Sequence, residues 1–306
     1  GNLAGYTITR ADGARKTGEQ VLYGGQPAGY TAQPIENVVY VSAHDNETIF
    51  DKVQYAAPAG ASLADRIRMN ALALDIVALS QGVPFFHAGD DVLRSKSLDG
   101  NSYNSGDWFN AIDWTYADNG WGHGLPMAGS NKDRWEVVRP LLGNPALKPG
   151  TAQITAARDH FLDMLRVRSS SPLFHLDAAG IKAGLTFLNQ GPDQIPGLIV
   201  MRLSDPDNRD PRWAGVLVLF NANPAAVTFS DAGLSTGWTL HPALAGGADP
   251  MLRQAGATAS SFSMPGRSTA VFVSATLSQV ASSATTGPRS SGDRAPPSGG
   301  GSRGSN

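Results

Sequence analysis

The segment that decides the fold reads Val38-Val39-Tyr40-Val41-Ser42-Ala43-His44-Asp45-Asn46-Glu47-Thr48. Its β-branched and aromatic first half predicts a buried strand. In (β/α) barrels, the loops that follow the strands carry the catalytic side chains. A carboxylate at Asp45, directly after the strand, therefore indicates an enzyme with a barrel. The alternative is that Asp45 and Asn46 merely turn the chain, because both residue types favour turns.

A helix and a second strand follow this segment. Ser62 and Asp65 form a capping-box pattern, which predicts that a helix begins there. Its apolar residues recur at helical spacing and cover nearly all of its circumference, so we expect a largely buried helix. Gly82 marks its end, and the apolar run at 83–89 predicts another buried strand. Strand, helix and strand with short connections predict a βαβ unit of a parallel sheet.

A long polar segment at 90–121 comes next and is rich in aromatic residues. A loop of this length is usually functional or disordered, and aromatic residues such as Tyr103, Trp108, Phe109, Trp114 and Trp121 argue against disorder. We expect it to form an ordered wall of a site. The next clear helix spans about 152–168.

The C-terminal third has a different pattern of residues. Short β-rich runs separated by Gly, Pro, Asn and Asp predict an antiparallel sandwich, with a domain boundary near 173–179. The predicted strands are 184–188, 198–203, 216–220, 227–229, 238–240, 261–264 and 269–273. The segment 276–306 has no aromatic residue and is predicted to be a disordered, low-complexity tail.

Composition excludes several classes of protein. The 306 residues include 24 Lys and Arg against 26 Asp and Glu, so nucleic acid and anionic membranes are not expected as partners. No cysteine is present, which excludes disulfides and thiolate metal sites. No apolar run approaches the roughly 20 residues of a membrane helix. Gly24-Gly25 lacks the pattern of a phosphate-binding loop and predicts a shaped turn.

Polar residues of the 90–121 segment are candidates for ligand binding. Arg94, Lys96, Asp99, Asn104 and Asp107 could hydrogen-bond a polyhydroxylated ligand. Neighbouring aromatic rings such as Trp108 could stack on sugar C–H faces. The alternative is a solvated surface loop. His87 is a further candidate, although a histidine at the end of an apolar strand is often a satisfied core residue.

Seven motifs of the chain carry a resemblance to a known family. They are 23–30 (YGGQPAGY), 40–48 (YVSAHDNET), 85–90 (FFHAGD), 93–97 (LRSKS), 102–110 (SYNSGDWFN), 168–174 (RSSSPLF) and 269–273 (TAVFV). In these motifs the chain resembles pullulanase-type starch-debranching enzymes, and the plant limit dextrinases most of all. The resemblance covers about residues 1–275 in the same order.

The resemblance implies an α/β plus all-β fold. It places the last strands and helices of an α-amylase-clan (β/α)8 TIM barrel at 1–175 and a C-terminal β-sandwich at 176–275. It also implies hydrolysis of α-1,6-glucosidic linkages with retention of configuration, through two carboxyl groups about 5 Å apart. A third carboxylate stabilises the positively charged transition state.

The resemblance assigns roles to individual residues. Asp45 matches the transition-state-stabilising carboxylate, and His44 matches a histidine that hydrogen-bonds sugar hydroxyls. Arg94, Asn104, Asp107 and Trp108, the candidates from the polar aromatic segment, are together with His44 the predicted substrate-binding residues. The family's nucleophile motif (G-F-R-F-D-like) and acid motif (G-E-G-W-like) do not occur in this sequence.

These departures predict a C-terminal part of a debranching glycosidase that is catalytically incomplete alone. One alternative is a non-catalytic α-glucan-binding protein derived from such an enzyme, and another is an isoamylase or branching enzyme. Branched α-glucans such as pullulan, limit dextrin and amylopectin are the implied partners. The chemistry requires no cofactor, although the family leaves room for a structural calcium ion. A plant-type parent implies the plastid, and a secreted bacterial parent is the alternative.

Overall fold

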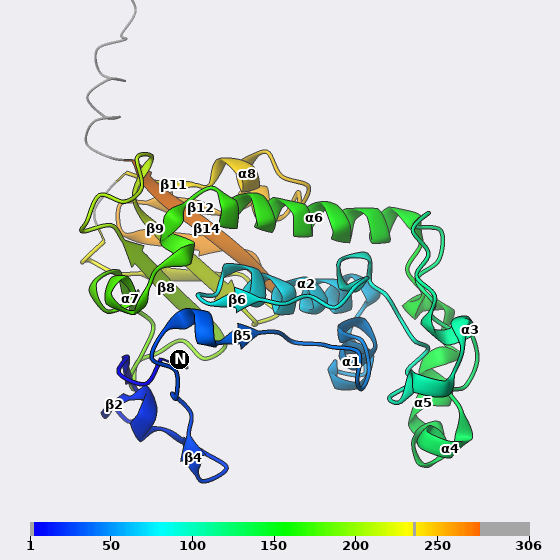
Figure 1. Cartoon of the computed structure of the whole chain (residues 1–306). Coiled ribbons are helices and arrows are strands. Elements are labelled where there is room, and N and C mark those ends of the chain that lie inside the picture. Colours follow the sequence, from blue (N-terminus) through cyan, green and yellow to red (C-terminus); the bar gives the residue numbers. More distant parts are fainter. Residues whose placement is uncertain (1–2, 235–236, 276–306) are drawn as a thin grey trace, which may run out of the picture.

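The computed structural model describes residues 3–234 and 237–275, so the predicted tail lies outside the described residues. The chain forms two short hairpins, a helical layer and two antiparallel sheets (Figure 1). Gly24 and Gly25 turn the second hairpin with φ of 55° and 79°, which confirms the predicted turn. The hairpin strands are β1 (Thr7–Thr9), β2 (Arg15–Thr17), β3 (Leu22–Tyr23) and β4 (Gln26–Pro27).

The predicted βαβ unit is present, but its strands are short and exposed. β5 (Val38–Val39) pairs in parallel with β6 (Val83–Pro84), and these two strands are the whole sheet within the described residues. Val38 is 52% exposed and Val83 is 39% exposed. The prediction of two buried strands is therefore wrong, because each strand here is an edge of a two-stranded sheet.

Helix α2 (Leu63–Leu79) begins as predicted. Ser62 Oγ accepts a hydrogen bond from the Asp65 amide at 3.1 Å, and the Asp65 carboxylate accepts one from the Ser62 amide at 3.4 Å. The preceding helix α1 (Ile49–Ala56) was not predicted. It begins directly after Thr48, whose hydroxyl oxygen accepts a hydrogen bond from the amide of Asp51.

The C-terminal end of α2 is held by a residue from far along the chain. Arg168 lies in α6 (Thr151–Ser169), which packs beside α2 (Figure 1). Its guanidinium donates to the carbonyl oxygens of Ala78 at 2.8 Å, Ser80 at 2.7 Å and Gly82 at 3.2 Å. A cation at this position satisfies carbonyl groups that the helix leaves unpaired.

Small helices fill the segment between β6 and α6. They are the 3-10 helices η3 (Asp90–Val92), η4 (Ser102–Asn104), η5 (Lys132–Arg134) and η6 (Pro145–Leu147) and the α-helices α3 (Asp107–Asn110), α4 (Ala128–Asn131) and α5 (Trp135–Leu142). Trp121 is 1% exposed and packs edge-on against Phe50 at 5.8 Å between ring centroids. The expected ordered, aromatic loop is therefore present.

All seven strand segments predicted for the C-terminal third are strands in the structure. A five-stranded sheet has the order β11-β14-β9-β8-β7 and a three-stranded sheet has the order β10-β13-β12, both antiparallel. The rings of Phe262 and Phe272 meet between the sheets at 5.2 Å. The strands are β7 (Leu185–Phe187), β8 (Leu198–Ser204), β9 (Trp213–Asn221), β10 (Val227–Ser230), β11 (Trp238–Leu240), β12 (Gly256–Thr258), β13 (Ser261–Met264) and β14 (Ser268–Ala275), flanked by α7 (Ala178–Gly184) and α8 (Pro242–Ala245).

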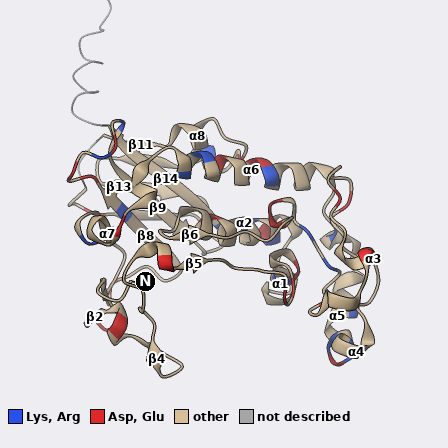
Figure 2. Ribbon diagram, viewed as in Figure 1, with Lys and Arg blue, Asp and Glu red and all other residues tan. Residues whose placement is uncertain are grey.

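Ion pairs connect the helical layer internally and to the sheets. His160 of α6 contacts both carboxylate oxygens of Asp75 on α2, at 3.0 and 3.1 Å. Arg68 of α2 reaches Asp249 in the loop after α8 at 2.9 Å. Charged residues of both signs are scattered over the helices and loops (Figure 2).

Candidate functional site

The polar residues that follow β5 and β6 converge on one cavity of about 230 Å³. Because parallel strands point the same way, the segments that leave their carboxyl ends lie at the same edge of the sheet. His44 and Asp45 come from the β5 side, and Arg94 comes from the β6 side. The lining residues are His44, Asp45, His87, Arg94, Lys96, Asn101, Ser102, Tyr103 and Asn110.

Lys96 fixes the backbone on which His44 and Asp45 stand. Its Nζ donates to the carbonyl oxygens of Asn46 at 2.6 Å and His44 at 3.3 Å. Lys96 is 2% exposed, so its ammonium group bonds the loop backbone rather than water. The side chains of His44 and Asp45 remain 89% and 85% exposed, with 3.7 Å between His44 Nε2 and Asp45 Oδ1.

Asp51 of α1 holds the loop that carries Lys96. Its carboxylate accepts hydrogen bonds from Ser95 Oγ at 2.5 Å, from the Lys96 amide at 2.7 Å and from the Leu98 amide at 3.2 Å. Burial raises the pKa of Asp51 to about 6. This buried carboxylate thus shapes the loop from beneath the cavity.

Arg94 is tied to neighbouring groups by most of its donors. Nη2 donates to the carbonyl oxygen of Asn110 at 2.5 Å, and Nη1 donates to the carbonyl oxygen of Ala88 at 3.1 Å and to His87 Nε2 at 3.2 Å. A guanidinium can only donate, so His87 Nε2 accepts and the ring proton is on Nδ1. Arg94 is 9% exposed. Its hydrogen bonds hold the cavity wall in place, and the same side chain also lines the cavity.

Asp90 joins the two sides of the site. It accepts a hydrogen bond from Ser42 Oγ at 2.5 Å, and its Oδ1 lies 4.0 Å from His87 Nδ1. Burial raises the pKa of Asp90 to about 6. Burial, followed by the charges of Arg94 and Lys96, lowers the pKa of His87 to about 4. The histidine is therefore neutral at neutral pH.

The structure brings together three of the six residues predicted to be catalytic or substrate-binding; the candidate Lys96 lines the same cavity, whereas the candidate Asp99 is fully buried. Asp45, His44 and Arg94 line the cavity, whereas Asn104, Asp107 and Trp108 are exposed on η4 and α3 and are not among its lining residues. Sequence reasoning gave no role to Asn101, Ser102 and Asn110. Asn110 contributes through its backbone carbonyl, for which side-chain patterns provide no signal.

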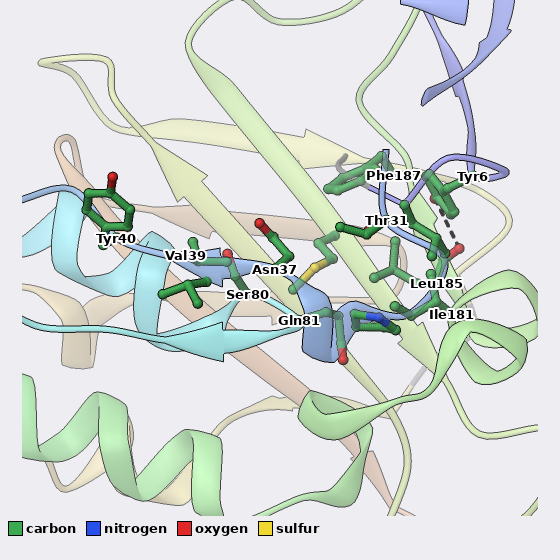
Figure 3. A pocket seen from close by; sticks show the side chains of 14 residues that line it. Tyr6, Thr31, Asn37, Val39, Tyr40, Ser80, Gln81, Ile181, Leu185 and Phe187 are labelled. Atoms are coloured by element: carbon green, nitrogen blue, oxygen red, sulfur yellow. Dashed lines mark hydrogen bonds between the residues drawn. The ribbon is translucent and has the colours of Figure 1, made fainter. Parts of the chain in front are cut away.

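A second cavity, of about 340 Å³, lies between the N-terminal segment, β5 and the edge strand β7 (Figure 3). Tyr6 there donates its hydroxyl to the carbonyl oxygen of Leu185 at 3.2 Å. None of the predicted site residues lines this cavity. Its lining includes no carboxylate or histidine.

The chemistry available to the first cavity is binding and charge stabilisation. Among its lining residues Asp45 is the single carboxylate. A retaining glycosidase needs two carboxyl groups about 5–5.5 Å apart. The cavity can therefore hydrogen-bond hydroxyl groups and oppose a positive charge, but these lining residues do not form the catalytic pair.

Comparison with protein families decides the relationship. The family described as "Alpha-1,6-glucosidases, pullulanase-type, C-terminal" matches residues 116–275. The chain belongs to this pullulanase family. The predicted resemblance is thereby confirmed.

Named pullulanases are similar over most of the chain. "Pullulanase 1, chloroplastic" from Arabidopsis thaliana is 43% identical over 284 residues, which cover 89% of this chain and 29% of that protein. "Pullulanase" from Klebsiella pneumoniae is 39% identical over 236 residues, which cover 76% of this chain and 22% of that protein. The chain thus spans less than a third of either relative.

Crystal structures of pullulanases have the same fold as the chain. The Klebsiella pneumoniae pullulanase complexed with maltotriose superimposes with a TM-score of 0.85 at 35% identity, over 90% of this chain and 27% of that one. The apo form gives the same TM-score and identity. The arrangement of helices and antiparallel sheets is therefore that of a pullulanase region.

The described residues contain neither a candidate metal cluster nor a candidate membrane-spanning helix. Within residues 3–234 and 237–275, no three His, Asp or Glu side chains are grouped so that they could hold a metal ion. In the same part of the chain, no helix is both long and apolar enough to cross a membrane.

Proposed function

We propose that this chain provides the C-terminal part of the catalytic unit of a debranching glycoside hydrolase that cleaves α-1,6-glucosidic linkages. In this proposal residues 1–175 form the last strands and helices of a (β/α)8 barrel, and residues 176–275 form the C-terminal β-sandwich. The parallel pairing of β5 with β6 supports the barrel, because polar groups collect where both strands end.

Asp45 is proposed as the carboxylate that stabilises the transition state, and His44 as a hydrogen-bond partner of sugar hydroxyls. Positive charge develops on the sugar ring as the bond breaks, and a fixed carboxylate lowers that barrier. The observation that carries the proposal is the convergence of Asp45, His44 and Arg94 on one polar cavity. Arg94, Asn104, Asp107 and Trp108 are the proposed substrate-binding residues.

Branched α-glucans are the proposed ligands, and pullulan, limit dextrin and amylopectin are the substrates to test. The chemistry needs no cofactor, and a bound calcium ion would be structural. The plastid is the proposed location on the strength of the chloroplastic relative, and secretion from a bacterium is the alternative because Klebsiella pullulanases are also relatives.

Hydrolysis by this chain alone is not expected, because the nucleophile and acid motifs are absent from its sequence. Release of reducing ends from pullulan by the purified chain would contradict this expectation. Binding is tested separately by affinity electrophoresis in amylopectin. We expect retardation that weakens in Asp45→Ala and is unchanged in the control Asp193→Ala, an exposed carboxylate between β7 and β8.

A non-catalytic α-glucan-binding protein is the second candidate function. The single carboxylate of the cavity favours it, since binding requires no catalytic pair. Mixing the chain with a polypeptide that carries the two missing motifs distinguishes the candidates. Restored pullulan hydrolysis that depends on Asp45 supports the enzyme, whereas glucan retardation without restored hydrolysis supports the binding protein.

A further inference from the structure

Trp108 and His123 hold each other in a fixed arrangement beside the candidate site. Trp108 Nε1 donates to the carbonyl oxygen of His123 at 2.7 Å, and His123 Nδ1 bonds the carbonyl oxygen of Trp108 at 2.9 Å. Because a carbonyl only accepts, the His123 proton is on Nδ1. The two rings lie 4.9 Å apart between centroids and are tilted by 30°.

We propose that this pair is a pre-formed stacking platform for one glucose ring of an α-glucan, with Trp108 as the contact surface and His123 as its positioning residue. The platform rests on the proposed glucan binding and adds to it a residue to which neither the sequence nor the comparisons assign a role. Trp108 is 65% exposed although its only polar side-chain atom is already bonded. What remains exposed is mainly the carbon surface of the indole, on the side away from His123.

His123 is itself anchored in the loop. Gly122 and Gly124, with φ of 80° and 121°, flank it, and such backbone angles are accessible mainly to glycine. Ser97 Oγ donates to the carbonyl oxygen of Gly124 at 2.7 Å. Asp118, which accepts from Lys148 Nζ through Oδ2 at 2.7 Å, lies beside the ring, with 3.5 Å between its Oδ1 and His123 Nε2. The imidazole therefore supports the indole from a fixed position.

Helix α3 connects the platform to the cavity. Trp108 and Asn110 are two residues apart in this one-turn helix. Asn110 lines the cavity, and its side chain donates to the carbonyl oxygen of Ser102 at 2.8 Å. The platform and the cavity therefore share one helical turn, and the proposal places a further sugar unit of the same glucan chain on the platform.

A sugar ring fits this surface better than a charged ligand. Aromatic faces bind C–H groups, and glucose presents such a face while its hydroxyl groups point outward. The charges next to the platform, on Asp118 and Lys148, neutralise one another. Holding the indole in advance removes the cost of ordering one side chain, so loss of His123 should weaken stacking roughly 3- to 10-fold.

The test follows two signals while maltotriose is titrated into the full chain labelled with ¹⁵N-Trp and ¹⁵N-Tyr. Trp108→Phe identifies the Trp108 indole signal, and Tyr103→Phe identifies the amide signal that reports on the cavity. We expect both signals to shift. His123→Ala should raise the dissociation constant seen at Trp108 roughly 3- to 10-fold, and Trp114→Phe, an exposed Trp of the same segment, should leave it unchanged.

Conservative variants separate positioning from general structure. His123→Asn keeps a donor near the Nδ1 position and should recover most of the affinity, whereas His123→Phe keeps the ring without the donor and should recover less. The remaining indole signals report whether each variant is folded. If His123→Ala does not fold, the affinity of His123→Asn decides whether His123 positions the indole.

Each outcome separates the platform from the proposed function. A shift at Tyr103 alone overturns the platform and leaves the proposed function standing. A shift at Trp108 alone supports the platform and contradicts binding in the cavity. No shift at either position overturns both, and unchanged affinity in His123→Ala overturns the positioning role.

Discussion

The ion pair between His160 and Asp75 makes a testable contribution to the packing of α6 on α2. Asp75 is 1% exposed and His160 is 12% exposed, so both groups are largely removed from water. Replacing His160 by Leu leaves the Asp75 carboxylate buried without this partner, which costs about 3–5 kcal/mol of unfolding free energy. A protein of this size loses roughly 2–4 °C of Tm per kcal/mol, so we expect Tm to fall by about 6–20 °C.

The same pair predicts the sign of a pH effect. Burial acts to lower the pKa of His160, but the charge and hydrogen bond of the Asp75 carboxylate raise it by more. The charge of Asp249 raises the pKa slightly further and that of Arg68 lowers it slightly, so the net effect is a raised pKa. A raised pKa means that the folded state binds this proton more tightly than the unfolded chain. The contribution is therefore full below about pH 6.5 and is lost as the pH rises through the folded-state pKa.

The assay is urea denaturation followed by circular dichroism at pH 6 and pH 9. The stability difference between the unmodified chain and His160→Leu should be larger at pH 6. The double variant Asp75→Leu/His160→Leu should be less destabilised than the sum of the single variants, because it removes both charges together. The exposed pair of Arg10 and Asp12 is the control, and Arg10→Leu should change stability by less than about 1 kcal/mol. Additive single variants, or a difference independent of pH, would refute the reasoning.

Three further predictions follow from close contacts. Asp51→Ala leaves three donors without their acceptor, and at about 1–3 kcal/mol for each buried group it should lower the unfolding free energy by at least about 3 kcal/mol in urea denaturation. Gly29→Ala places a Cβ 2.6 Å from backbone atoms of η1 (Gly18–Gln20) and should lower Tm, whereas Gly60→Ala, with nothing within 4 Å, should not. Lys96→Met frees two carbonyl groups, so hydrogen exchange of residues 44–48 should become faster while that of the sandwich strands stays unchanged.

Local signals were sufficient where the structure depends on local chemistry. The capping box at Ser62 predicted the start of α2, and short β-rich runs predicted every strand of the two antiparallel sheets except β12. A related signal was overlooked at Thr48, whose side chain caps α1 through the amide of Asp51. The T-x-x-D spacing there is the same one that located α2.

The rest of the site depends on contacts that no local pattern encodes. Arg94 was expected to face a ligand, yet its guanidinium is largely occupied by carbonyl oxygens up to 16 residues away. Lys96 is buried because it bonds carbonyl groups about 50 residues earlier in the chain. No signal in the sequence indicated His123, because its partner, Trp108, lies 15 residues before it. Such pairings follow from the folded path of the chain, and single-sequence reasoning does not see them.

The hydrogen bonds by which Arg168 holds the C-terminal end of α2 form late during synthesis, because the arginine is added to the chain well after the helix. The end of α2 leads directly into β6, and beyond β6 lie His87 and Arg94. Arg168 follows Ala78 by 90 residues. At about 5–20 residues per second, the ribosome adds this arginine roughly 5–18 seconds after the helix end that it secures. For several seconds the nascent chain therefore carries its candidate site without these hydrogen bonds. A chaperone has access to the candidate site during this period.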